Sequence, residues 1–157
     1  MFKIILDKIW DILNANTLIQ EVYKYETSEF RGGPAATIVP SANESDYNTT
    51  EENVRIYAFT VRLFVNRDVR VKEKADEVLM TLVNSVLDDF DKYYSLSALG
   101  TDGSAIPGGA IVNATGYTFI NIFAVPSVWG YVGREDEFRI AEIDVRCRVS
   151  VDLSSIS

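Results

Sequence analysis

The side chains that most often carry out catalysis or bind transition metals are nearly absent from this sequence. It contains no histidine and one cysteine, Cys147. Without histidine, Ser-His-Asp and Cys-His catalysis, histidine-ligated zinc and histidine acid–base chemistry are all excluded. A single cysteine also excludes an internal disulfide. Because Cys147 falls on the apolar face of a predicted strand, we expect an inert core thiol rather than a nucleophile.

The remaining candidates for chemistry are carboxylates and aromatic rings. Asp88, Asp89 and Asp91 offer oxygen ligands for Mg²⁺ or Ca²⁺, but the solvated end of a helix is the simpler interpretation. Trp129 and Tyr131 could stack on a base or a sugar, yet the lack of a basic patch beside them favours a protein–protein contact. No glycine-rich phosphate loop is present. We therefore predict no catalytic site, no cofactor and no metal.

The charge composition also limits the partners. Lys and Arg number 15 and Asp and Glu number 23, so the formal net charge is −8 over 157 residues. This excess of acidic residues argues against sequence-independent binding to nucleic acid and against binding to an anionic membrane. No apolar run approaches the roughly 20 residues that a membrane helix requires. The length fits a single domain, residues 1–157.

The spacing of apolar residues predicts the elements that must position any site. Residues 2–13 and 72–93 have the three- and four-residue spacing of amphipathic helices. Strands are predicted at residues 18–25, 35–39, 54–65, 111–125 and 141–153. The last strand alternates most strictly, with one apolar face and one charged face.

This order, α-β-β-β-α-β-β, predicts an α+β fold of two layers, in which one mixed or antiparallel sheet carries both helices on one face. The strand at 35–39 lies between two prolines, so we expect it near a sheet margin. Residues 41–53 and 95–109 are expected to be long, flexible loops, and residues 128–133 an aromatic turn.

One face of the predicted sheet has no helix to cover it. Its charged residues are Arg62, Glu142, Asp144, Arg146, Arg148 and Asp152. Alternating signs there could form cross-strand ion pairs. A small domain with one uncovered sheet face and long loops at its ends is typical of a protein built to assemble.

The order of elements resembles that of the tail terminator proteins of long-tailed bacteriophages, the lambda-type ring that caps the tail tube. The features that carry the resemblance are an N-terminal helix of about a dozen residues, a strand, and then the proline-bracketed strand Pro-Ala-Ala-Thr-Ile-Val-Pro at 34–40. A long strand at 54–65, the helix at 72–93 and two closing strands follow. The loops at 41–53 and 95–109 are longer than the family pattern.

The resemblance implies a structural virion protein without catalytic activity. Such a protein forms a ring, expected to be a hexamer, that ends tube polymerisation and presents a surface to the head. The implied partners are copies of the chain itself, the major tail tube protein and the head–tail connector protein, with DNA passing through unbound. The implied location is the head-proximal end of the tail, after assembly in the host cytoplasm.

Two groups of residues are assigned roles within that ring. The polar sheet face, with Arg62, Glu142, Asp144, Arg146, Arg148 and Asp152, is expected to meet the neighbouring subunit or line the channel. The candidates for docking on partners are Asp46, Tyr47, Glu51, Glu52, Asp102, Trp129 and Tyr131.

Two alternatives remain open at this stage. One is a head–tail connector or neck completion protein, which is also a ring without catalytic activity. The other is a small carboxylate-dependent enzyme or ligand-binding module that uses Trp129, Tyr131, Glu135 and Asp136. That alternative requires a deep pocket holding a carboxylate with a shifted pKa.

Overall fold

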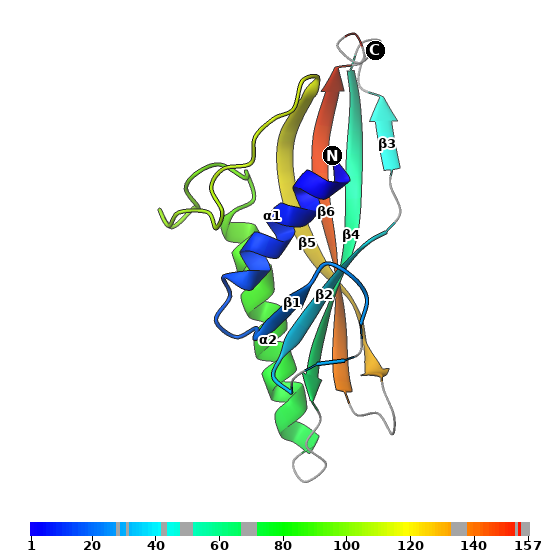
Figure 1. Cartoon of the computed structure of the whole chain (residues 1–157), viewed down its shortest axis with the longest axis vertical. Coiled ribbons are helices and arrows are strands. Elements are labelled where there is room, and N and C mark those ends of the chain that lie inside the picture. The colour runs from blue at the N-terminus through cyan, green and yellow to red at the C-terminus, as the bar shows by residue number, and fades with distance from the viewer. Residues whose placement is uncertain are drawn as a thin grey trace.

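The described residues form two helices and six strands (Figure 1). The computed structural model describes residues 1–27, 29–30, 32–41, 44–47, 52–66, 72–132, 138–152 and 154, and it describes only the backbone of residues 44–47, 52, 72 and 73. The elements are α1 (Phe2–Asn14), β1 (Glu21–Tyr23), β2 (Ala35–Pro40), β3 (Glu44–Tyr47), β4 (Glu52–Asn66), α2 (Lys72–Lys92), β5 (Tyr117–Val132) and β6 (Phe138–Asp152).

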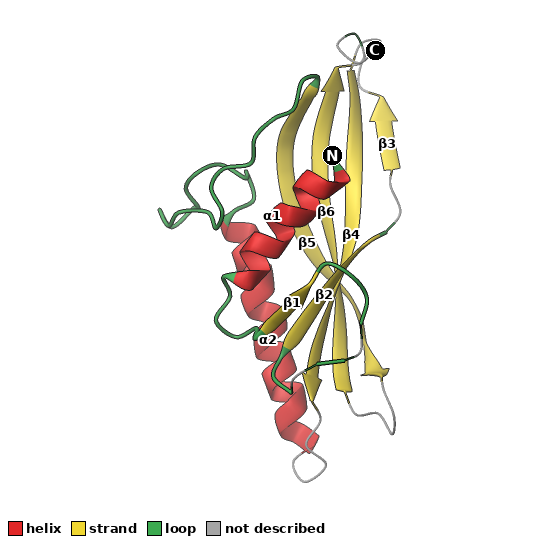
Figure 2. Cartoon of the chain, viewed as in Figure 1, coloured by secondary structure: helices red, strands yellow, loops and turns green. Residues whose placement is uncertain are grey.

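All six strands form one mixed sheet with the order β1-β2-β4-β6-β5, and β3 lies beside the first part of β4. β1 and β2 are parallel, and every other pair is antiparallel. Both helices lie on the same face of this sheet (Figure 2). The predicted two-layer α+β fold is therefore confirmed. No helix in the described ranges is long and apolar enough to cross a membrane.

The core lies between the helices and the sheet, because the apolar stripes of the sequence meet there. α1 buries Ile5, Ile9, Ile12 and Leu13, and α2 buries Leu79, Leu82, Val86 and Phe90. β4 and β6 run side by side over 15 residue pairs and face the helices with alternate side chains such as Phe59, Val61, Val145 and Cys147. The burial of Cys147 confirms that this thiol belongs to the core.

Three predicted strand boundaries differ from the structure. Residues 44–47, expected in a loop, form β3, because their backbone pairs with that of β4. The strand expected at 18–25 shortens to β1, because Asn16 accepts hydrogen bonds from the backbone N–H groups of Leu18 and Ile19 and makes a turn there. The strand expected at 111–125 begins at Tyr117, after Gly116 with φ of +81°.

The prediction of an aromatic turn at 128–133 is wrong for the residues that the structure describes. Val128 to Val132 continue β5 and pair with Glu142 to Phe138 of β6, and residue 133 lies outside the described residues. The long pairing with β6 keeps this segment extended. A register shift between Pro126 and Val128 absorbs one extra residue there.

The segment expected to be flexible at 95–109 is held in place on both sides. Ile106 donates a backbone hydrogen bond to Ala98, and Ile111 donates one to Leu96. The side chains of Leu96 and Ile106 are buried in the core. The Lys8 ammonium of α1 also donates hydrogen bonds to backbone carbonyls in this segment. Its glycines therefore shape a fixed loop rather than a mobile one.

The sheet face away from the helices is not wholly uncovered by this chain. Ala35, Phe64, Phe138 and Ile140 form a second, smaller apolar cluster on that face. Phe30, from the β1–β2 connection, packs on it, with its ring centroid 4.5 Å from that of Phe64 and 5.4 Å from that of Phe138. The expectation of a fully free face was wrong at this end, because the connection crosses over it.

Candidate functional site

The rest of that sheet face carries the predicted charged residues. Arg62 and Glu142 are direct partners in the β4–β6 register, and Arg62 Nη2 lies 2.6 Å from Glu142 Oε1. Arg62 Nη1 also donates to Glu26 Oε1 at 3.1 Å. Both members of the cross-strand pair are partly buried. This pair therefore ties β4, β6 and the β1–β2 connection together.

The other four predicted residues lie further along β6 on the same face. They are Asp144, Arg146, Arg148 and Asp152, and all are partly exposed. Arg146 Nη2 lies 3.9 Å from Asp144 Oδ2, and Asp152 accepts hydrogen bonds from the backbone and hydroxyl of Ser154. With Arg62 and Glu142, the predicted residues are three arginines and three carboxylates, and Glu26, bonded to Arg62, adds a fourth carboxylate, so these residues carry no excess of positive charge.

Trp129 and Tyr131 lie on the opposite face, beside α2. Arg139 connects them to the helix: its guanidinium lies 4.5 Å from the Tyr131 ring centroid, and its Nε donates to Asp76 Oδ1 at 2.7 Å. Trp129, Asp76, Arg139 and Met80 line a small hollow of about 190 Å³. Trp129 is 44% exposed, Tyr131 46% and Met80 54%. Trp129 and Met80 are the exposed apolar members of this hollow at the edge of the sheet, which we call the tryptophan hollow.

β5, which carries Trp129 and Tyr131, is an edge strand without a single charged residue over Tyr117–Val132. Near its start, the edge is covered by the preceding segment, since Ile122 donates a backbone hydrogen bond to Tyr94 and Phe119 donates one to the Asn113 side chain. From residue 123 onward, no strand among the described residues pairs with the outer edge. Its exposed apolar residues include Val125 and Val128.

The predicted docking residues do not converge on one surface. Asp46 and Tyr47 belong to β3, and Glu52 begins β4, while Glu51 lies outside the described residues. Asp102 lies in the loop after α2, where hydrogen bonds from the side chain and backbone of Ser104 lower the pKa of its carboxyl group. Trp129 and Tyr131 lie beside the other end of α2. The Glu135 and Asp136 named in the enzyme alternative also lie outside the described residues.

An apolar hollow of about 360 Å³ lies on the other flank of α2 and was not predicted from the sequence. Its apolar wall consists of Leu18, Pro34, Val78 and Leu82, and its remaining lining residues are Lys74, Glu77 and Thr81. Leu18 and Val78 are exposed there. We call this feature the leucine hollow. It has the size at which small ligand pockets begin, roughly 300 Å³.

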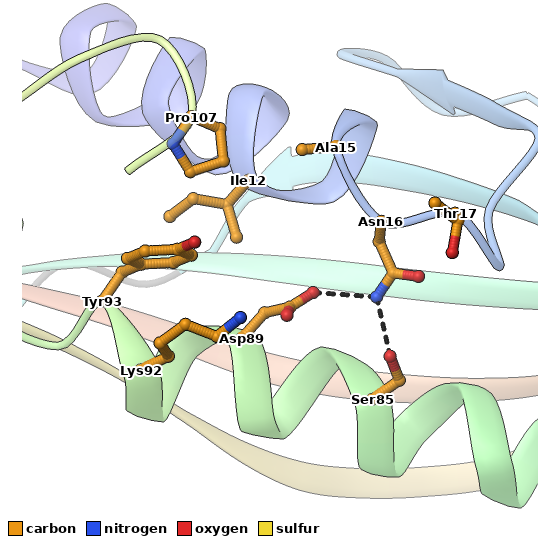
Figure 3. Close-up of a pocket in the computed structure, with 9 residues that line it drawn as sticks. All are labelled: Ile12, Ala15, Asn16, Thr17, Ser85, Asp89, Lys92, Tyr93 and Pro107. Carbon is orange, nitrogen blue, oxygen red and sulfur yellow. Dashed lines mark hydrogen bonds between the residues drawn. The ribbon is translucent and has the colours of Figure 1, made fainter. Parts of the chain in front are cut away.

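A smaller polar pocket of about 210 Å³ lies where α1 ends against α2 (Figure 3). Asn16 Nδ2 donates to Asp89 Oδ2 at 2.8 Å and to Ser85 Oγ at 2.9 Å. Burial raises the pKa of the Asp89 carboxyl group, and the hydrogen bond from Asn16 partly opposes that rise. These hydrogen bonds connect the end of α1 to α2, so the polar groups of the pocket have a structural role.

The described residues contain no group of His, Cys, Asp and Glu side chains that could hold a metal ion. Asp89 of the predicted acidic cluster is bonded to Asn16 rather than grouped with Asp88 and Asp91 around a common point. Burial raises the pKa of the Cys147 thiol to about 12, so it is protonated at neutral pH.

Taken together, the fold and these surfaces define a two-layer α+β domain with an uncharged edge strand, a tryptophan hollow and a leucine hollow. No protein-family model matches the chain, and a search of curated proteins finds no similar sequence.

One signal in the sequence includes β5, namely the stretch of residues 103–133, which contains no Asp, Glu, Lys or Arg. The leucine hollow had no such signal, because its apolar wall comes from Leu18, Pro34, Val78 and Leu82, which only the fold brings together.

Proposed function

We propose that this protein is a structural ring-forming protein of the phage tail terminator type. In this proposal, copies of the chain join into a closed ring that caps a tail tube, ends its polymerisation and presents a surface to the head. The observation that carries the proposal is the uncharged β5 strand, whose outer edge from residue 123 onward pairs with no strand among the described residues.

Edge strands in proteins that act alone are usually protected by charged side chains, short length or a covering segment. Charged residues make up 24% of this chain, yet β5 has none over 16 residues. The part beyond residue 123 also exposes apolar side chains such as Val125. A strand of this composition is favoured where another protein surface covers it, and copies of the same chain are always present at assembly.

The sheet face supports the same proposal. Its three arginines and three carboxylates make no basic stripe, and the whole chain carries a formal charge of −8. A channel wall of this kind releases few counterions from DNA and so lets DNA slide rather than bind. In the proposed ring, the face with Arg62 and Glu142 is directed toward the channel. The ring would contact the tail tube protein on one side and the head–tail connector on the other.

The first test is the mass of the purified protein by native mass spectrometry, together with negative-stain imaging. A ring of uniform mass supports the proposal, and six copies of the 17.6 kDa chain give about 106 kDa. A clean 17.6 kDa monomer at high concentration, without tail tubes, contradicts it.

A second test separates the terminator from a neck protein. Tail assembly is carried out without this protein, and tube length is measured by electron microscopy. Over-long tubes support length termination. Tubes of normal length that fail to join heads overturn the terminator function in favour of the neck function. Tubes of normal length that do join heads overturn both functions.

A further inference from the structure

The end of β5 reads almost the same in both directions. Residues 128–132 are Val-Trp-Gly-Tyr-Val, so an aromatic residue and then a valine stand on either side of Gly130. This segment pairs with β6 without a register shift, so its side chains alternate regularly. The two aromatic residues lie on the face that carries α2, and Gly130 and the two valines lie on the other face. The segment is therefore symmetric about Gly130 in the type of residue and in the face that each residue occupies.

We infer that this segment pairs with the same segment of a second copy, antiparallel and around a two-fold axis at Gly130. In that register, Trp129 lies opposite Tyr131 of the second copy, Val128 lies opposite Val132 of the second copy, and Gly130 lies opposite itself. Aromatic and β-branched residues that face each other across antiparallel strands stabilise the pairing. Because the axis is two-fold, each contact away from it occurs twice.

The backbone of β5 is directed to form this pairing. The N–H group of Ile122 points away from β6, since it donates to the segment that precedes the strand. Trp129 and Tyr131 pair with residues of β6 that alternate in step with the partner of Ile122, so their backbone groups are also directed to the outer edge. The carbonyl of Gly130 is directed toward β6, where Arg139 Nη1 also donates to it at 2.7 Å. The two-fold register thus places the outward groups of Trp129 and Tyr131 opposite each other.

The side chains at the contact are accessible to a second copy. Val128 is 47% exposed, Trp129 44% and Tyr131 46%. At the axis, the two Gly130 residues form a pair of the type without hydrogen bonds, in which the Cα atoms approach to about 4.5 Å. Glycine suits this position because it has no side chain to separate the strands.

The distribution of charge favours a second copy of this chain over a different partner. A two-fold axis places each residue close to it against its own copy, so a charged side chain there would meet the same charge. No Asp, Glu, Lys or Arg occurs in residues 103–133, although the chain carries a formal charge of −8. Two copies of this acidic chain can therefore approach along β5 without bringing like charges of the strand together.

A two-fold contact joins two copies and does not by itself close a ring. The inference therefore concerns the free protein and goes beyond the proposed function. Pairing covers an uncharged edge strand, which is otherwise prone to pair with other chains. In the proposed function, this pair separates when β5 joins the ring.

The test places one new cysteine at the axis. A Cβ atom at Gly130 would lie 3.8 Å from Ile140 Cγ1, an ordinary contact, so Gly130→Cys is expected to fold, which circular dichroism checks. The two new thiols then face each other at a Cα separation that a disulfide can span. The native Cys147 is buried and stays apart from this reaction.

The matched control is Ser127→Cys on the same strand. Ser127 lies three residues before the axis, so the two Ser127 positions are on opposite sides of it and about 20 Å apart. Under a mild oxidant without tail tubes, we expect Gly130→Cys to form a covalent dimer of twice 17.6 kDa, about 35 kDa, on a non-reducing gel. It should form at least roughly 10-fold faster than with Ser127→Cys. Equal rates for the two variants overturn the inference but leave the proposed function standing, because tube length decides that function.

A charge exchange at the same position gives an independent readout in native mass spectrometry. Gly130→Asp and Gly130→Lys each place two like charges at the axis, so each variant alone should be a 17.6 kDa monomer. Their mixture places opposite charges there and should restore the 35 kDa pair. A mixture that stays monomeric, or single variants that pair as the wild type does, overturn the inference. A wild-type chain that stays monomeric at high concentration overturns both the inference and the proposed function.

Discussion

Replacing Lys8 by methionine should release the loop after α2 from α1. Lys8 is only 5% exposed, although lysine is rarely buried without partners. Its ammonium donates to the carbonyl of Pro107 at 2.8 Å and to that of Gly109, and it lies 3.4 Å from Asp11 Oδ2. The side chain thus connects α1 with a segment about 100 positions further along the chain.

The size of the effect follows from the bonds that are lost. Methionine keeps the apolar stem of Lys8 but donates no hydrogen bond. Leaving a buried acceptor unsatisfied costs about 1–3 kcal/mol. Gly109 is exposed, so water can reach its carbonyl, whereas Pro107 is partly buried. We therefore expect Lys8→Met to lower the free energy of unfolding by about 2 kcal/mol, which for a domain of this size lowers Tm by roughly 4–8 °C.

The assay is urea unfolding followed by circular dichroism, with Lys3→Met as the control. Lys3 is on the same helix, 85% of its side chain is exposed, and its described ion pair is the surface contact with Asp7, so its replacement should change stability by less than about 0.5 kcal/mol. Hydrogen exchange at the amides of Ile106 and Ile111 should accelerate in Lys8→Met alone. Equal stabilities of the two variants, with unchanged exchange at both amides, would refute the reasoning.

Three further predictions concern the core and its titratable groups. Phe30→Ala should lower the free energy of unfolding by about 2–3 kcal/mol, because it uncovers the apolar cluster on the far sheet face. Tyr25 is exposed, so Tyr25→Ala should lower the free energy of unfolding by less than about 1 kcal/mol. Urea unfolding of the two variants measures the difference. The raised pKa of Asp89 means that the folded protein keeps this proton to higher pH than the unfolded chain, so the contribution of Asp89 to stability falls as the pH rises above 3.8. Asp89→Asn should lack that fall, and parallel unfolding curves for the two proteins between pH 4 and 7 would contradict it. Cys147, with its pKa raised to about 12 by burial, should react with a thiol reagent far more slowly in the native protein than in urea, as absorbance measures.

Much of the fold could be predicted because its signals are local. The apolar spacing at residues 2–13 and 72–93 corresponds closely to α1 and α2. The strict alternation of β6 predicted the buried face from Ala141 to Val151, but not the burial of Phe138 and Ile140 on the opposite face. The loop at 95–109 was misjudged because its glycines favour turns, while its order comes from contacts with distant residues such as Lys8.

The candidate site was predictable only in part. The shared face of Arg62 and Glu142 followed from strand alternation, and the structure places the two side by side in the register. Trp129 was identified as an exposed aromatic residue, but its neighbours Met80 and Arg139 were not, because their approach depends on how α2 crosses the sheet.

The amino-acid sequence by itself determined the absence of histidine chemistry, the helices, the long strands and the face that each presents to the core. These properties depend on residue types and on neighbours two to four positions apart. Only the tertiary structure decided that Phe30 covers one end of the far face, that β5 lies at an edge of the sheet, and that Leu18, Pro34 and Val78 line one hollow. Contacts between such distant residues arise from the packing of all layers at once, and no local pattern records them.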